Sequence, residues 1–222
     1  MTASASLEAS TDIRERGLSM NDGKLGVTLD GSLPLGENFV IDASAETLRG
    51  SARNGGSDLG LQIAPAYSLS SDGWNVRAGL RGHVYIDAGE LDYIEVEGTL
   101  SHTIGPMWLS AGASYAPSQD AIGGSNLYLH ANAEIGIPGM PLTVFAGAGQ
   151  TIGTTSLAAR AVRLRPDGNY TDWYLGIERT KLNFAIGLEL TGTSIDPDSG
   201  RSSIYWDKHS GSRVAGYVRV SF

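Results

Sequence analysis

The stretch "WNVRAGLRGHVYI", residues 74–86, decides the fold because its alternation is unbroken. The residues of one face are mostly apolar: Trp74, Val76, Ala78, Leu80, Gly82, Val84 and Ile86. The other face is polar or charged apart from one glycine: Asn75, Arg77, Gly79, Arg81, His83 and Tyr85. Successive side chains of a β-strand point to opposite sides of the sheet, so the pattern predicts a strand with one apolar and one charged face.

The same period of two recurs along the rest of the chain. Its further segments cover residues 7–14, 24–30, 39–46, 59–69, 93–101, 109–115, 127–137, 142–148, 173–177, 182–190 and 213–222. Short Gly- or Pro-rich turns alternate with longer polar loops between them, and the longest loops are residues 151–169 and 194–212. Outer-membrane barrels combine short periplasmic turns, long extracellular loops and an even number of strands. A soluble sandwich or barrel, the alternative, has no physical reason to sort its connections in this way.

We therefore expect an all-β fold, a single transmembrane antiparallel up-and-down β-barrel of twelve strands over residues 1–222. Composition agrees with this and narrows the function. The net charge of −8 disfavours nucleic acid as a partner, and the lack of cysteine excludes disulfides and thiolate metal sites. No apolar stretch is long enough for a transmembrane helix. The polar start "MTASASLEAS" predicts a mature chain, with its signal peptide removed and Met1 added.

Aromatic residues collect near the ends of the expected strands. Phe39, Trp74 and Phe222 fall on the short-turn side, and Tyr115, Tyr170 and Trp173 on the long-loop side. Such positions are typical of the aromatic belts at membrane interfaces, although strand ends are often aromatic in any case. The terminal Phe222 also resembles the signal by which the barrel-assembly machinery recognises its clients.

The inward faces of the strands predict a charged lumen. The expected pore-lining residues are Arg14, Asp42, Glu46, Arg77, Arg81, His83, Glu95, Glu97, Glu134, Glu178, Glu189, Arg213, Tyr217 and Arg219. A register that pairs Arg81 with Glu97 and His83 with Glu95 is expected within two residues. Barrel closure should bring Arg213 and Arg219 near Glu8, Asp12 and Arg14. These groups either form a transverse field across a channel or a set of salt bridges that plug it.

The stretch "SLAARAVRLR", residues 156–165, departs from the period of two and has apolar residues at helical spacing. Two hypotheses follow for its arginines, Arg160, Arg163 and Arg165. They belong either to a short helix that constricts the barrel mouth, or to an extracellular loop that meets lipopolysaccharide phosphates.

No set of residues predicts a catalytic or metal centre, and we expect no cofactor and no metal. The chain has four histidines, at positions 83, 102, 130 and 209. Ser101 and His102 are neighbours on a strand, so their side chains point apart and cannot act together. The acidic turn "DPDSG", residues 196–200, has its glycine one position too early for a calcium loop of the EF type. The sequence therefore predicts a protein that is not an enzyme.

Three short segments resemble the TorF family of proposed porins, also known as the gcw_chp family. The segment "TDIRERGLS" resembles the opening of that family through Asp12, Arg16, Gly17 and Ser19, with Ile13 where an aromatic is usual. The segment "ELDYIEVEGTLSH" resembles its central motif through Asp92, Tyr93 and Glu95, and "NYTDWYLGIE" a later one through Tyr170, Asp172, Trp173 and Gly176. The resemblance implies an outer-membrane β-barrel and a porin, with no established solute.

Taken together, the sequence predicts a channel in the bacterial outer membrane for passive diffusion of small solutes or ions. Its expected partners are outer-membrane lipid and lipopolysaccharide, the barrel-assembly machinery through Phe222, and the solutes themselves. A structural or adhesive barrel with a plugged lumen is the alternative, and a membrane-embedded enzyme is the third reading.

Overall fold

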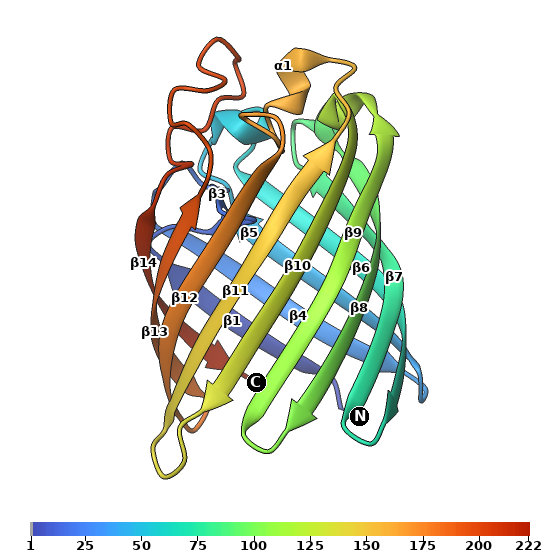
Figure 1. Ribbon diagram of the computed structural model, residues 1–222, viewed down its shortest axis with the longest axis vertical. Helices are drawn as coiled ribbons and strands as arrows, with labels where there is room; N and C mark the ends of the chain where they lie inside the picture. The colour runs from blue at the N-terminus through green and yellow to red at the C-terminus, as the bar shows by residue number, and fades with distance from the viewer. Residues whose placement is uncertain (1) are drawn as a thin grey trace.

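The computed structural model describes residues 2–222, and its twelve long strands form one closed antiparallel barrel. Figure 1 shows the barrel with the short turns and both termini at one end and the long loops at the other. The barrel strands are β1 (Ser4–Ser10), β4 (Gly26–Leu35), β5 (Phe39–Thr47), β6 (Leu59–Ser71), β7 (Trp74–Tyr85), β8 (Tyr93–Ile104), β9 (Met107–Gln119), β10 (Gly124–Gly136), β11 (Leu142–Gly153), β12 (Tyr170–Lys181), β13 (Phe184–Thr193) and β14 (Arg213–Ser221). The predicted fold class is confirmed.

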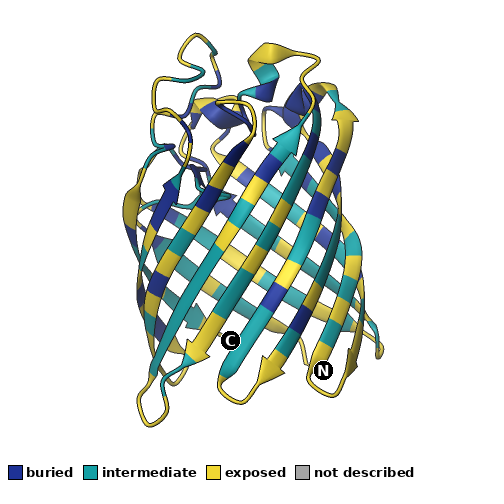
Figure 2. Ribbon diagram, in the orientation of Figure 1, coloured by how far each residue is buried: buried dark blue, intermediate teal, exposed yellow. Residues whose placement is uncertain are grey.

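The first and last strands close the barrel. β1 pairs with both β14 and β4, and Glu8 lies opposite Arg219 across the seam. Apolar side chains cover the outer wall, where Leu80, Ile94 and Leu188 are about half exposed. Exposed and less exposed residues alternate along the strands in Figure 2. The outer face is the one that meets lipid, because a transmembrane barrel turns its apolar side chains outward. No helix within residues 2–222 is long and apolar enough to cross a membrane.

The first segment is shorter than the sequence predicts. The predicted strand over residues 7–14 ends at Ser10, and the chain then forms a small hairpin of β2 (Arg14–Glu15) and β3 (Leu18–Ser19). The two residues of its turn, Arg16 and Gly17, have φ angles of 52° and 75°. Two-residue hairpin turns favour such positive φ angles, so a local turn overrides the alternation here. We call residues 14–19 the first-loop hairpin.

The hydrophobic core lies at the loop end of the barrel. Its buried residues are Met20, Leu48, Tyr85, Ala88, Leu91, Tyr93, Ala116, Ala121, Ile122, Leu164 and Tyr205, which belong to all six long loops or to the strand ends beside them. Short helical turns bring several of them inward: η1 (Ala52–Asn54), η2 (Gly89–Leu91), η3 (Asp120–Ile122) and α1 (Ala158–Ala161). We call this set the loop cluster.

Candidate functional site

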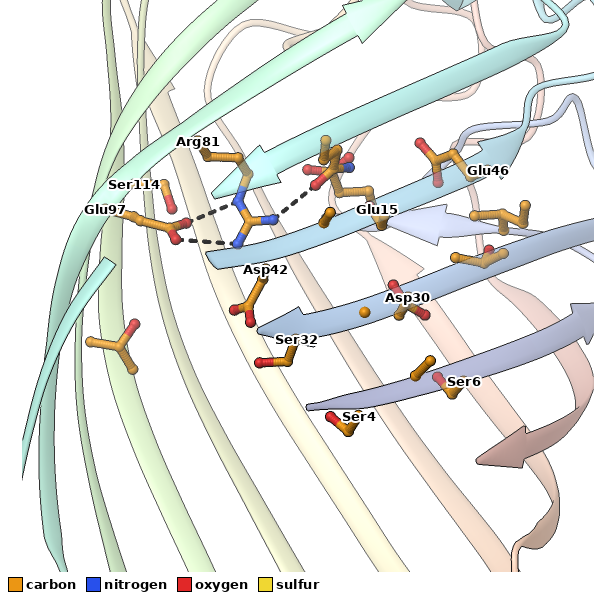
Figure 3. Close-up of a pocket in the computed structure, with 18 of the residues that line it drawn as sticks. Ser4, Ser6, Glu15, Asp30, Ser32, Asp42, Glu46, Arg81, Glu97 and Ser114 are labelled. Atoms are coloured by element: carbon orange, nitrogen blue, oxygen red, sulfur yellow. Dashed lines mark hydrogen bonds and ion pairs between the residues drawn. The ribbon is translucent and has the colours of Figure 1, made fainter. Parts of the chain in front are cut away.

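The larger lumenal cavity occupies about 950 Å³. Its walls are residues of β1 and of β4 to β10, and it reaches Ser221 and Phe222 at the short-turn end. The first-loop hairpin contributes Arg14, Glu15 and Arg16 to its lining. Figure 3 shows Arg81 facing Glu97 in this cavity, with Asp30, Asp42 and Glu46 on neighbouring strands. The cavity is therefore a polar vestibule, bounded on the loop side by the hairpin.

A smaller cavity of about 330 Å³ lies on the other side of the hairpin, and Ile13 and Arg14 line both. Carboxylates and aromatic rings dominate its lining: Glu8, Asp12, Glu134, Glu178, Glu189, Phe145, Tyr174 and Tyr217. The side chains that line the two cavities include ten carboxylates and five arginines, a net charge of −5. None of the loop-cluster residues lines either cavity, so both end below the cluster.

Ion pairs span the inner wall of β5 to β8. Arg77 contacts Asp42 at 2.5 Å, and Arg81 contacts the Glu97 carboxylate at 2.9 and 3.2 Å. His83 Nε2 lies 3.2 Å from Glu95 Oε2. The backbone register places Arg81 opposite Glu95 and His83 opposite Tyr93, two residues from the expected pairing. The expected side chains still meet, because long side chains reach diagonal neighbours across a strand pair.

The first-loop hairpin is fastened to the wall by Arg16. Its guanidinium forms two hydrogen bonds with Glu95, of 2.9 and 2.6 Å, and lies 4.7 Å from the ring centre of Tyr128. The Tyr170 hydroxyl donates a hydrogen bond of 2.9 Å to the Arg16 carbonyl. A two-pronged arginine–carboxylate contact fixes geometry as well as charge. Sequence reasoning missed this role of Arg16, and the turn dipeptide Arg16-Gly17 within a polar segment was the available signal.

Charge in the hairpin shifts two pKa values. Burial acts to lower the pKa of the Arg16 guanidinium, but the carboxylates of Glu95 and Glu15 outweigh it and raise that pKa well above its usual range. Burial acts to raise the pKa of the Glu15 carboxyl, but the positive charges around it, Arg16 first, hold that pKa below its usual value. Both groups are therefore charged at neutral pH.

The three segments that resemble the TorF family meet at the hairpin. In the first, Ser19 donates a hydrogen bond of 2.6 Å to Asp12. The second supplies Glu95 to Arg16, and the third supplies Tyr170 to the Arg16 carbonyl. Gly17 has no room for a side chain, since a Cβ there would lie 2.5 Å from Thr193 Cγ2. These short motifs therefore build one structural unit, the docked hairpin.

The two arginines of the last strand, Arg213 and Arg219, differ in their ion pairs. Arg219 forms ion pairs with Glu178 and, at 3.5 Å, with Glu8, and the Tyr217 hydroxyl donates to Glu178 at 2.8 Å. Arg14 leaves the strand with the hairpin and contacts Asp12 at 2.7 Å. Arg213 is exposed at the loop end of β14, and it forms no ion pair within residues 2–222. Of the two arginines expected near Glu8, only Arg219 is there.

The arginines of the fifth long loop do not constrict either cavity. Arg163 is 1% exposed and donates hydrogen bonds to the carbonyls of Arg53, Leu91 and Ala121 at 3.0, 3.1 and 2.6 Å. Arg165 is buried and donates to the Thr154 carbonyl. Burial lowers the pKa of both guanidinium groups. Arg163 therefore joins the fifth long loop to three others, whereas Arg165 is bonded within its own loop. Neither side chain lines a lumenal cavity or stands on the loop surface, as the two hypotheses for these residues require.

Arg160 lies within α1, the short helix that the apolar spacing indicated. Its guanidinium lies 3.4 Å from the Glu90 carbonyl and 3.3 Å from the Asp120 carbonyl, at the exposed edge of the loops. The two carbonyls belong to the third and fourth long loops. Arg160 lines neither lumenal cavity. Among the long loops within residues 2–222, only the first lines either cavity.

The aromatics expected at the membrane interfaces lie on the outer wall. Phe39, Trp74, Tyr115, Trp173 and Phe222 are all exposed, between 40% and 75%. Tyr170 does not belong with them, since it is 3% exposed and faces the hairpin. Its parity on β12 is opposite to that of Trp173, so it points into the barrel.

The histidines are dispersed. His83 is buried and stacks on Tyr93, with ring centres 4.2 Å apart, and His130 lines the larger cavity. His102 stacks on Trp74 at 4.1 Å, on the outer wall, and Ser101 beside it points the other way. His209 lies 3.5 Å from Asp22 among the loops. Within residues 2–222, no group of three or more His, Asp or Glu side chains could hold a metal ion.

Known structures show the same fold at low sequence identity. The NanC porin matches with a TM-score of 0.66 and 11% identity, over 98% of each chain. The KdgM porin matches with a TM-score of 0.62 and 9% identity, over 99% of each chain. LpxR from Salmonella typhimurium matches with a TM-score of 0.55 and 12% identity, also over 99% of each chain. The fold is thus that of porin-like outer-membrane barrels.

No curated protein matches the sequence. The sequence does match the family described as "Bacterial protein of unknown function (Gcw_chp)" over residues 1–213. This description contains the second of the two family names that the motifs suggested and does not contain the name TorF. The match spans almost the whole chain, from the first strand into the closing strand. The protein therefore belongs to the Gcw_chp family.

Proposed function

We propose that the protein is an outer-membrane channel for passive diffusion of small solutes or ions through its charged lumen. The observation that carries this proposal is the vestibule of about 950 Å³, lined by Arg77, Arg81, Asp42 and Glu97 and reaching the short-turn end. Charged groups in an apolar surrounding are costly unless they are paired or hydrated. A water-filled lumen hydrates them. The likeness of the fold to the KdgM and NanC porins supports the same reading.

The lumen should prefer cations. Five arginines face ten carboxylates in the two cavities, and several of the carboxylates are already paired with arginine. Glu134 and Glu189 form no ion pair within residues 2–222, although both line the smaller cavity. Unpaired negative charge in a narrow polar passage raises the local concentration of cations. Arginines and carboxylates on separate strands also produce a field across the passage that orients dipolar solutes.

A second candidate is a structural or adhesive barrel with a plugged lumen. The observation in its favour is the loop cluster, in which residues from all six long loops are buried together above both cavities. Under the channel proposal this arrangement is a closed state, and the first-loop hairpin or the cluster must move before a solute passes. If the barrel is instead structural or adhesive, the closure by the loop cluster is permanent, and the exposed surface of the loops carries the function.

Conductance in planar lipid bilayers tests the two functions. We expect discrete conductance steps with a cation-selective reversal potential under a salt gradient. Liposome swelling with sugars and amino acids of increasing size would then give the size limit. A protein that is folded by its heat-modifiable gel mobility, yet shows no conductance at any salt or voltage, supports the plug. A conducting variant with a released hairpin, beside a silent native protein, identifies a closed channel.

The terminal residue is proposed to mark the chain for barrel assembly. Phe222 is 75% exposed at the short-turn end, where its ring can be contacted. Deletion of Phe222 should lower the amount of protein inserted in the outer membrane of cells. Refolding into detergent in vitro should be unchanged, because the ring packs against little of the barrel. Equal insertion with and without Phe222 would contradict this role.

A further inference from the structure

The lipid-facing wall carries charge at one place. Strand pairing puts Arg179 opposite Leu142 and Ile186, and Lys181 opposite Phe184, so both side chains point outward. They are the only Asp, Glu, Lys or Arg residues at outward positions of the twelve barrel strands within residues 2–222. Both are at the end of β12 nearest the short turns. Neither forms an ion pair in that part of the chain.

A groove begins at Arg179 and runs along the outer wall. It has a volume of about 610 Å³. Its lining is mostly apolar, and the polar residues in it are Ser10, Thr11, Arg179 and Tyr217. It extends from Leu142, at the short-turn end of β11, past Leu188 and Gly216, to Leu25 at the loop end of β4. Because the strands are tilted, this course across neighbouring strands lies along the barrel axis. An acyl chain of the bilayer has the same direction.

Gly216 forms part of the groove floor. A Cβ at this position would meet only Leu188 Cδ2 at 3.3 Å and the Gly187 carbonyl at 3.9 Å. A larger side chain therefore has room to stand in the groove without a clash with the backbone. The glycine is not required by the backbone geometry, and its absent side chain leaves the groove deep at its middle.

A positive charge on the lipid face is costly at the centre of the bilayer and becomes tolerable near the interface. Arg179 lies at the end of β12 nearest the short turns, where we expect the headgroups of the periplasmic leaflet, because short turns of such barrels are periplasmic. The anion available at that level is a phosphate ester of a glycerophospholipid. A guanidinium binds phosphate oxygens with two parallel hydrogen bonds, and a lysine beside it adds a point charge.

We propose that this face binds a glycerophospholipid of the periplasmic leaflet. Arg179 and Lys181 hold its phosphate, and one acyl chain fills the groove over Gly216. The match of a single cationic site with the start of an apolar, axially directed groove carries the proposal. Within residues 2–222, no other outward position of the barrel strands combines a cationic side chain with the start of such a groove.

Native mass spectrometry of the full chain, released from detergent micelles with added dioleoylphosphatidylglycerol, tests the site. The native protein should retain one lipid. Arg179→Leu combined with Lys181→Leu should raise the apparent Kd about tenfold, the change that loss of a charged hydrogen bond produces. Gly216→Leu should weaken binding as well, although no charge is lost. Gly98→Leu is the matched control, because Gly98 faces outward on β8, across the barrel, with similar room for a side chain.

Several outcomes would overturn the proposal. One is equal lipid occupancy in the native protein and in the doubly substituted one. Another is equal weakening by Gly216→Leu and Gly98→Leu. A third is binding of glycerol 1-phosphate as tight as that of the intact lipid, which would remove the groove from the site. A fourth is a dimer that is lost in Gly216→Leu and carries no lipid, which would assign the groove to a second copy. Should the charge variant not fold, the two glycine variants decide alone.

Discussion

Releasing the first-loop hairpin is the most direct test of how the lumen is closed. Arg16→Ala removes both hydrogen bonds to Glu95, whose side chain is 0% exposed, and leaves that carboxylate with His83 alone. Breaking one partner out of a buried ion pair costs about 3–5 kcal/mol. Since 1.4 kcal/mol is a factor of ten, the undocked population should rise by about a hundred- to a few thousand-fold.

The absence of cysteine makes this population measurable. A single Leu18→Cys substitution places one thiol in the hairpin, at a position that is fully buried when the hairpin is docked. In this shared background, the rate of maleimide labelling reports the undocked fraction. We expect Arg16→Ala to raise the rate by two to three orders of magnitude, and to raise single-channel conductance with it.

A double-mutant cycle decides whether the ion pair is the cause. Glu95→Gln added to Arg16→Ala removes the unpaired buried charge, so the double variant should label more slowly than Arg16→Ala alone. A labelling rate within about threefold of the native one in Arg16→Ala would refute the reasoning. So would a double variant in which the two effects simply add. Faster labelling with unchanged conductance would show that the hairpin is docked as described but is not the constriction.

Three further predictions concern the loops, the smaller cavity and pH. Arg163→Met leaves three loop carbonyls without their donor, at about 1–3 kcal/mol each, and should expose the loops to trypsin while the barrel stays heat-modifiable. Glu134→Gln with Glu189→Gln should move the reversal potential toward zero, because two unpaired lumenal charges are lost. A depressed pKa means that the ionised Glu15 stabilises the docked hairpin above the usual value of 4.5. This stabilisation of the docked hairpin is lost only as pH falls below 4.5 and through the lowered pKa of Glu15. Conductance should therefore be constant from pH 7 to 5 and rise at pH 3.

Matched variants accompany these tests. Arg160→Met, which removes two long contacts at the exposed edge of the loops, should leave trypsin cleavage near that of the native protein. Glu37→Gln changes charge in an exposed short turn and should not move the reversal potential. Glu15→Gln should abolish its share of the acid transition. A reversal potential that shifts equally in the Glu37 variant would show that the charge of the whole molecule, not of the lumen, sets selectivity.

Strand alternation and the order of short and long connections were enough to predict the barrel. The segment over residues 74–86 became β7, and the outward and inward faces assigned from it are those of the structure. The exception was residues 11–14, where the alternation persists but the chain has left the barrel wall and turns into the lumen. Alternation reports only which face a strand would show. It carries no information on where a strand ends, and the Arg16-Gly17 turn ended this one.

The lumen was predicted less completely, because contacts there depend on positions that are distant in sequence. The ion pairs of Arg81 with Glu97 and of His83 with Glu95 come from adjacent strands with a short connection, so register reasoning reached them within two residues. The contact between Arg16 and Glu95 joins a loop to a strand 79 residues away. The burial of Arg163 against three other loops is of the same kind.

The sequence by itself determined the number of strands and which face of each is apolar, because both follow from the side-chain period of two within a strand. Only the tertiary structure decided what closes the lumen. Loops lack a period, and their side chains find partners through packing at the end of the barrel. Arg163, which one hypothesis from the sequence placed in a basic constriction, donates hydrogen bonds to carbonyls of other loops. An arginine of the first loop, Arg16, lies beside the lumen and binds Glu95.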